Sequence, residues 1–101
     1  MKIIERISDR ITDEIGDAKT YAMMALEIRD EYPDMARVMY TISMQEMEHM
    51  RMLHDGVANI INKYRTERGE PPEKMMYIYN YLHEKQIEKA AEAKNIQAMF
   101  K

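Results

Sequence analysis

Apolar side chains recur along residues 4–32 in alternating steps of three and four. This first seam consists of Ile4, Ile7, Ile11, Glu14, Ala18, Tyr21, Ala25, Ile28 and Tyr32. A second seam with the same spacing consists of Met35, Met39, Ile42, Glu46, His49, Leu53, Gly56 and Ile60. A weaker stripe follows, formed by Met75, Tyr79, Leu82, Ile87, Ala90 and Ile96. Such spacing keeps one face of an α-helix turned toward a packed partner, so three amphipathic helices are predicted.

Proline and glycine divide these helices from one another. Tyr32 precedes Pro33 and is therefore driven out of the helical conformation, whereas a proline suits the first turn of a new helix. Gly69 is a suitable cap residue, and Pro71 and Pro72 prevent the second helix from continuing. The predicted helices cover about residues 3–31, 33–68 and 72–100.

The short break between the first two helices implies an antiparallel hairpin. If its turn is centred near residues 31–32, residues that face each other have numbers that sum to about 63. Glu14 then faces position 49, and Glu46 lies less than one turn away. We predict one all-α domain over residues 1–101, in which the third helix packs across the hairpin or reaches a neighbouring subunit.

Glu14, Glu46 and His49 are the acidic and imidazole residues that interrupt the two otherwise apolar seams. Such groups on a packed face lose their hydration, which is costly unless a partner compensates them. Glu46 and His49 are three residues apart on one helix, so both can reach the same ion, with Glu14 reaching it from the facing helix. Carboxylate and imidazole ligands without thiolate favour iron or manganese over structural zinc.

These three ligands are half of a known set. Helical bundles that hold two metals use one Glu from each of two helices and a Glu-x-x-His from each of the other two. A two-fold homodimer would supply the missing half, because an isologous interface places the same residues on both sides of its axis. The sequence therefore predicts at least a dimer that forms a four-helix bundle with two metal ions.

The segments that carry these residues resemble the ferritin-like di-iron carboxylate superfamily. Glu14-Ile15-Gly16-Asp17-Ala18-Lys19-Thr20-Tyr21, followed by Gln45-Glu46-Met47-Glu48-His49, looks like the first half of a rubrerythrin or ferritin domain. The resemblance covers roughly residues 3–64, and no second Glu-x-x-His is present. The closest parallel is the encapsulated-ferritin type, whose short subunit builds its ferroxidase site across a dimer interface. Those proteins usually end in a capsid-targeting tail, whereas this chain ends in helix-like sequence, so an enclosing shell is left open.

The resemblance implies a ferroxidase that oxidises Fe(II), with Glu14, Glu46 and His49 as metal ligands. Tyr21, seven residues after the first Glu, matches a ferritin tyrosine beside the metal site, and would donate a hydrogen bond to a ligand or supply an electron. Two alternatives remain. A peroxide-reducing enzyme would need an external electron donor, since the chain lacks the cysteines that hold iron in rubrerythrins. A non-enzymatic helical adaptor would use the polar seam residues to fix its register.

The composition limits which binding partners and which cellular location are expected. The net charge of −3 gives no basic surface for nucleic acid, and the longest apolar run, Tyr21 to Leu26, is too short to span a membrane. The first residues contain no apolar signal-peptide segment, so a cytoplasmic location is expected. The absence of cysteine excludes disulfides and thiolate zinc sites. His54 is expected on the surface, and His83 is expected to be a core or interface histidine that could cover the metal site.

Overall fold

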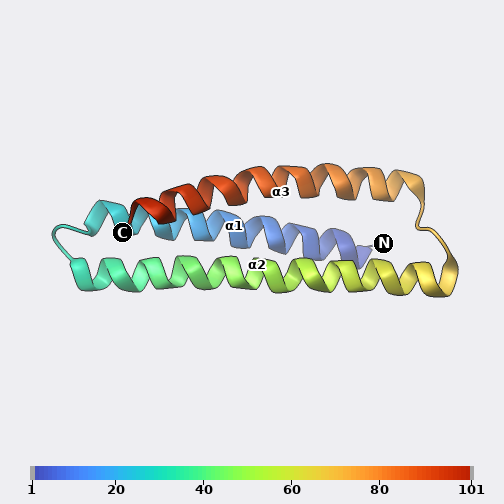
Figure 1. Ribbon diagram of the computed structural model, residues 1–101, viewed down its shortest axis with the longest axis horizontal. Helices are drawn as coiled ribbons and strands as arrows, with labels where there is room; N and C mark the ends of the chain where they lie inside the picture. Colours follow the sequence, from blue (N-terminus) through green and yellow to red (C-terminus); the bar gives the residue numbers. More distant parts are fainter. Residues whose placement is uncertain (1, 101) are drawn as a thin grey trace.

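The computed structural model describes residues 2–100 and contains three helices, with no strand in that range. The helices are α1 (Lys2–Ile28), α2 (Pro33–Arg68) and α3 (Glu73–Met99) (Figure 1). The prediction of an all-α chain with three helices is therefore confirmed. No helix in the described part of the chain is long and apolar enough to cross a bilayer.

The turn between α1 and α2 begins earlier than predicted. α1 ends at Ile28, three residues before its predicted end, because Tyr32 must leave the helical conformation ahead of Pro33 (φ −130°, ψ 68°). The Tyr32 amide still donates a hydrogen bond to the Ile28 carbonyl at 2.7 Å. The Ala36 amide then donates to the Tyr32 carbonyl at 2.9 Å, which starts α2. Four residues, 29–32, thus reverse the chain.

A left-handed glycine ends α2. Gly69 has a φ of 83°, a conformation in which any side chain would be strained, and its amide donates to the Arg65 carbonyl at 3.1 Å. The Arg65 guanidinium also bonds the Glu70 carboxylate at 3.1 Å, just beyond the cap. These contacts fix the exit from α2 before the two prolines direct the chain into α3.

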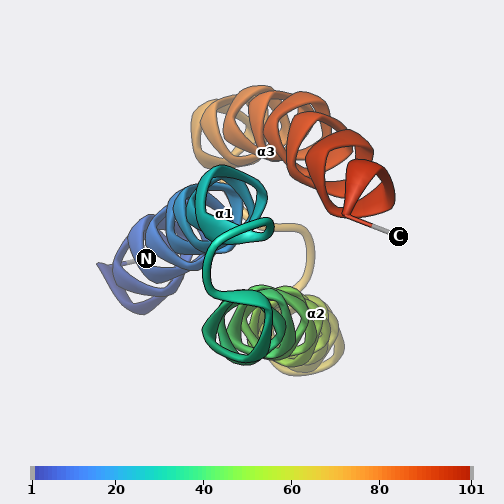
Figure 2. The ribbon, with the colours of Figure 1, turned by 90° about the vertical axis from the view of Figure 1, so that its left-hand side faces the viewer.

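The three helices form an elongated, open arrangement with α1 in the middle. α1 and α2 are antiparallel, and α3 returns along α1 in the same direction as α1 (Figure 1). Viewed along the helices, α2 and α3 lie on different sides of α1, and they make few contacts with each other (Figure 2). The radius of gyration of 16.4 Å exceeds the roughly 13 Å of a compact chain of this length. The third helix therefore packs on the first helix of the hairpin.

The core of the hairpin lies one residue away from the predicted second seam. The buried residues of α2 are Ala36, Ser43, Met47, Val57 and Ile61. Those of α1 are Ile4, Ser8, Ile11, Ile15, Ala18, Ala22 and Ala25, which face both α2 and α3. Because α1 packs against two helices, several seam residues are displaced to the edge of the α1–α2 contact. This edge, called here the hairpin face, consists of the half-buried Ile7, Glu14, Tyr21, Ile28, Ile42, Glu46, Leu53 and Ile60 together with the exposed His49.

Two buried glutamines of α3 form hydrogen bonds to the hairpin. The Gln86 side-chain amide donates to the Ser8 carbonyl at 3.1 Å, the Ser8 hydroxyl at 3.0 Å and the Thr12 hydroxyl at 3.2 Å. Near the other end of α3, the Gln97 amide donates to the Ser43 hydroxyl at 2.8 Å. Hydrogen bonds that satisfy buried groups in this way also fix the position of α3 along α1.

The Gln86→Ala variant should lower the free energy of unfolding by about 1–3 kcal/mol, because the buried Ser8 hydroxyl loses its donor. Urea denaturation measures this change. Gln45→Ala removes the same side chain from an exposed position of α2 and should change stability by less than about 0.5 kcal/mol. Equal losses in the two variants would show that Gln86 does not hold α3.

Candidate metal centre

The structure brings together the three predicted ligands. Glu14 lies in the middle of α1, and Glu46 and His49 occupy one turn of α2. One donor atom from each residue lies within 4.8 Å of the others. His49 Nδ1 is 3.6 Å from Glu14 Oε2 and 3.9 Å from Glu46 Oε1. The predicted opposition of Glu14 and position 49 across the hairpin is therefore found.

The three ligands differ in burial. The Glu14 and Glu46 side chains are 14% and 18% exposed, whereas the His49 side chain is 54% exposed. Within the single chain, burial therefore removes much of the two carboxylates from water but not the imidazole. The displacement of the second seam to the edge of the helix contact is the reason.

The two carboxyl groups cannot easily be ionised together. The pKa of Glu46 is raised to about 7, first by hydrogen bonding with the Glu14 carboxylate, then by burial, and then by the negative charge of Glu14. The charge of Asp17 raises this pKa further, while His49 opposes the shift. Near neutral pH the pair therefore shares a proton in a position where a cation could replace it.

Glu14 carries the clearest sign that this group suits a cation. Its Oε2 atom is buried and receives no hydrogen bond from the described residues. A buried acceptor without a donor costs about 1–3 kcal/mol, and in this position it faces an imidazole nitrogen and a second carboxylate. Two carboxylates and one imidazole fit Fe(II) or Mn(II), which prefer oxygen and nitrogen donors. The residues present therefore suit a divalent cation, which would need further ligands to complete its coordination.

Solvent reaches the site through an open cavity of about 330 Å³. Its lining residues are Arg10, Glu14, His49, Met52 and Leu53. Arg10 lies one turn before Glu14 and points a guanidinium toward it, with 3.8 Å between Arg10 Nη2 and Glu14 Oε1. An ion and small oxidants would thus have access from this side.

Tyr21 lies two turns beyond Glu14 on the same stripe of α1, roughly 10 Å farther along the axis. It is half-buried, and its hydroxyl makes no hydrogen bond to any residue between 2 and 100. Its predicted role beside the metal remains a prediction.

Two histidines lie in contact in a groove between α2 and α3, a pairing that the sequence did not predict. His54, expected on the surface, is half-buried and stacks on His83 with ring centroids 4.7 Å apart. His83 also stacks on Tyr79 at 5.9 Å, and its buried Nδ1 has no hydrogen-bond partner among residues 2–100. Burial, with a smaller contribution from His54, lowers the pKa of His83. The stacked pair links α2 and α3. That His83 covers the metal site remains a prediction.

The position of His54 in the helical pattern of α2 could have predicted its partial burial. It continues the stripe that includes Met47, Met50 and Val57, which is the stripe that α2 buries. If this stripe, and not the neighbouring seam, had been taken as the buried face of α2, His54 would have been predicted to lie in the helix contact.

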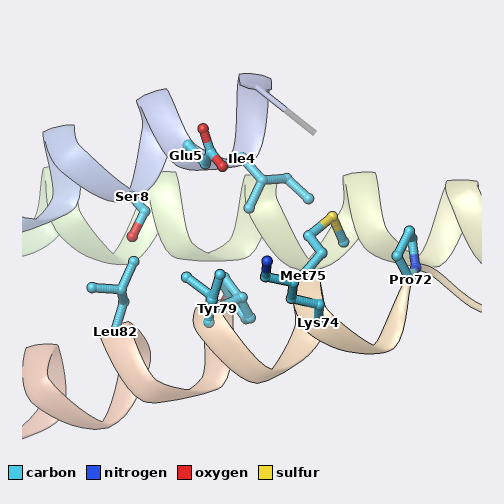
Figure 3. A pocket seen from close by; sticks show the side chains of 9 residues that line it. Ile4, Glu5, Ser8, Pro72, Lys74, Met75, Tyr79 and Leu82 are labelled. Atoms are coloured by element: carbon cyan, nitrogen blue, oxygen red, sulfur yellow. The ribbon is translucent and has the colours of Figure 1, made fainter.

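A separate apolar pocket of about 330 Å³ lies between the first turns of α1 and α3 (Figure 3). Ile4 and Ser8 of α1 face Met75, Tyr79 and Leu82 of α3 there. Its lining includes one Glu and one Lys but no cluster of metal-binding or nucleophilic groups. The Glu14–Glu46–His49 group is therefore the stronger functional candidate.

Comparison with known proteins finds no matching family model, no matching curated protein and no matching solved structure.

The pH dependence of unfolding should reveal the shared proton. Glu46 titrates near 7 in the folded chain and near 4.5 when unfolded, so its contribution to stability is present at low pH and is lost as the pH rises through this window. In metal-free protein, Glu46→Gln should therefore gain about 1–3 kcal/mol over wild type at about pH 7.5 and much less at about pH 5.

Glu48→Gln is the matched control for that experiment. Glu48 lies two residues away on α2, and its hydrogen bond from Arg51 lowers its pKa, so its removal should bring no gain at either pH. Urea denaturation in the presence of a chelator measures all three proteins. A Glu46→Gln advantage that is the same at both pH values would contradict the shared proton.

Proposed function

We propose that the chain binds iron through Glu14, Glu46 and His49 and oxidises Fe(II) at a di-iron site completed by a second copy of itself. The main support is the convergence of three donors from two helices around a buried carboxylate oxygen that has no donor. The raised pKa of Glu46 adds to this support, because it marks excess negative charge at the same point. The resemblance of these segments to ferritin-like proteins agrees with this choice of metal.

The hairpin face is the proposed dimer interface. It is partly apolar, carries all three ligands, and lies away from α3, whose contacts with α1 involve Ser8, Thr12 and Lys19. Two hairpins joined by a two-fold axis on this face would give a four-helix bundle with both α3 helices outside it. Four carboxylates would then neutralise two divalent cations, and two imidazoles would complete the donor set.

Each residue has a distinct part in this proposal. The two carboxylates supply the negative charge that favours the oxidised ion, and the proton shared by Glu46 leaves when the cation binds. His49 contributes a neutral ring nitrogen from the exposed side, where its position can adjust. Iron, as the substrate, supplies the electrons that pass to dioxygen or peroxide. Tyr21 is the candidate for a hydrogen bond to the site or for electron transfer.

Aerobic addition of Fe(II) should raise the near-ultraviolet absorbance of wild-type protein faster than that of buffer, and the protein should retain about one iron per chain. Glu46→Ala should reduce both the rate and the iron content by at least about tenfold, because it removes a ligand. Glu48→Ala, an exposed carboxylate on the same helix, should behave as wild type.

Iron uptake and oxidation that are equal in wild type, Glu46→Ala and buffer would contradict the proposal. If Glu46→Ala were also more stable than wild type, a polar seam in a non-enzymatic adaptor would be the better account. Iron bound but oxidised only when peroxide and an electron donor are present would favour peroxide reduction.

A further inference from the structure

Glu14 is the one carboxylate of the site with a permanent cation beside it. Arg10 Nη2 lies 3.8 Å from Glu14 Oε1, and no other Lys or Arg in residues 2–100 forms an ion pair with Glu14, Glu46 or His49. Arginine side chains in proteins carry a positive charge. The metal-free site therefore contains a fixed positive charge.

The two oxygens of Glu14 have different surroundings. Oε2 is buried and lies 3.6 Å from His49 Nδ1, on the side where the three donors converge. Oε1 is the oxygen that the Arg10 guanidinium approaches, and both residues line the open cavity. Arg10 is thus the cationic partner of Glu14 on the side opposite to the converging donors.

Arg10 has a second acidic neighbour and space to move. Its side chain is 65% exposed, and its Nη1 atom is already 3.6 Å from the carboxylate of Asp13. The adjoining cavity of about 330 Å³ leaves room for the guanidinium to move away from Glu14. Since Asp13 lies one residue before Glu14 and is itself exposed, the guanidinium could leave Glu14 without losing every charged partner.

We propose that Arg10 is the built-in counter-ion of the metal-free site and competes with the incoming metal. It holds the Glu14 carboxylate in place while the site is empty, and it must withdraw toward Asp13 and the cavity when a divalent cation binds. This inference rests on the proposed function. Arg10 thereby sets the metal affinity of the site, which would be higher without it.

The competing explanation is an ordinary surface ion pair between residues four apart on a helix, which contributes little. The two explanations differ in sign. If Arg10 only orients Glu14, its removal leaves metal affinity unchanged or weaker. If Arg10 competes with the metal, its removal strengthens binding.

Manganese(II) binding to the full chain separates them, because Mn(II) binds without being oxidised and the free ion is counted by electron paramagnetic resonance. Arg10→Gln should bind Mn(II) roughly three- to tenfold more tightly than wild type at low salt, and the difference should shrink at high salt. Arg10→Lys, which keeps the charge, should remain within about twofold of wild type. Arg37→Gln, which removes an exposed guanidinium paired with Asp34, should have no effect.

Equal or weaker binding by Arg10→Gln would overturn the inference while leaving the proposed function standing. Wild-type protein that binds neither Mn(II) nor Fe(II) would overturn the proposed function. A double-mutant cycle of Arg10→Gln and Glu14→Gln, unfolded by urea with a chelator present, tests the pairing of Arg10 with Glu14 independently of metal. The effects on the urea midpoint should be non-additive, and additive effects would show that Arg10 is not the counter-ion of Glu14.

Discussion

Two carboxyl groups held together at the edge of a helix contact are the constraint on which the account of this molecule depends. The antiparallel pairing of α1 and α2 places Glu14 beside Glu46 and His49, with donor atoms within 4.8 Å of one another. Most of each carboxyl group is removed from water, so their charges need compensation. Without a metal ion, the raised pKa of Glu46 reduces the negative charge of the pair. The buried Oε2 of Glu14 still has no hydrogen-bond donor among the described residues. A divalent cation would remedy both.

The position of α3 gives the hairpin its proposed freedom to pair. α3 packs on α1 and hardly touches α2, so the hairpin face is not covered by the chain itself. Gln86 bonds Ser8 of α1 and Gln97 bonds Ser43 of α2, and these buried contacts hold α3 on the hairpin. The stacked His54 and His83 add a link between α2 and α3 in the groove above α1. The same packing explains why the predicted seam is half-buried, since α1 divides its buried surface between two neighbours.

Local chemistry was enough to predict the helices and the facing of the ligands. Pro33 and Gly69 act within a few residues of themselves, and the position of a turn determines which residues of two antiparallel helices are level. The buried stripe of α2 could not be chosen in this way, because adjacent stripes were both apolar and the choice depends on a third helix. α3 itself has a weak pattern, and glutamines that anchor a helix look like surface residues until their acceptors are known. His54 was misplaced for the same reason.

The most direct test of the central claim is the mass of the intact chain by native mass spectrometry, with and without Fe(II) under anaerobic conditions. If metal neutralises carboxylates where two copies meet, binding should drive association, and Fe(II) should convert the protein to a dimer that carries two metal ions. Glu46→Ala should remain metal-free under the same conditions. A wild-type chain that stays metal-free, or that binds iron only as a monomer, would contradict the account.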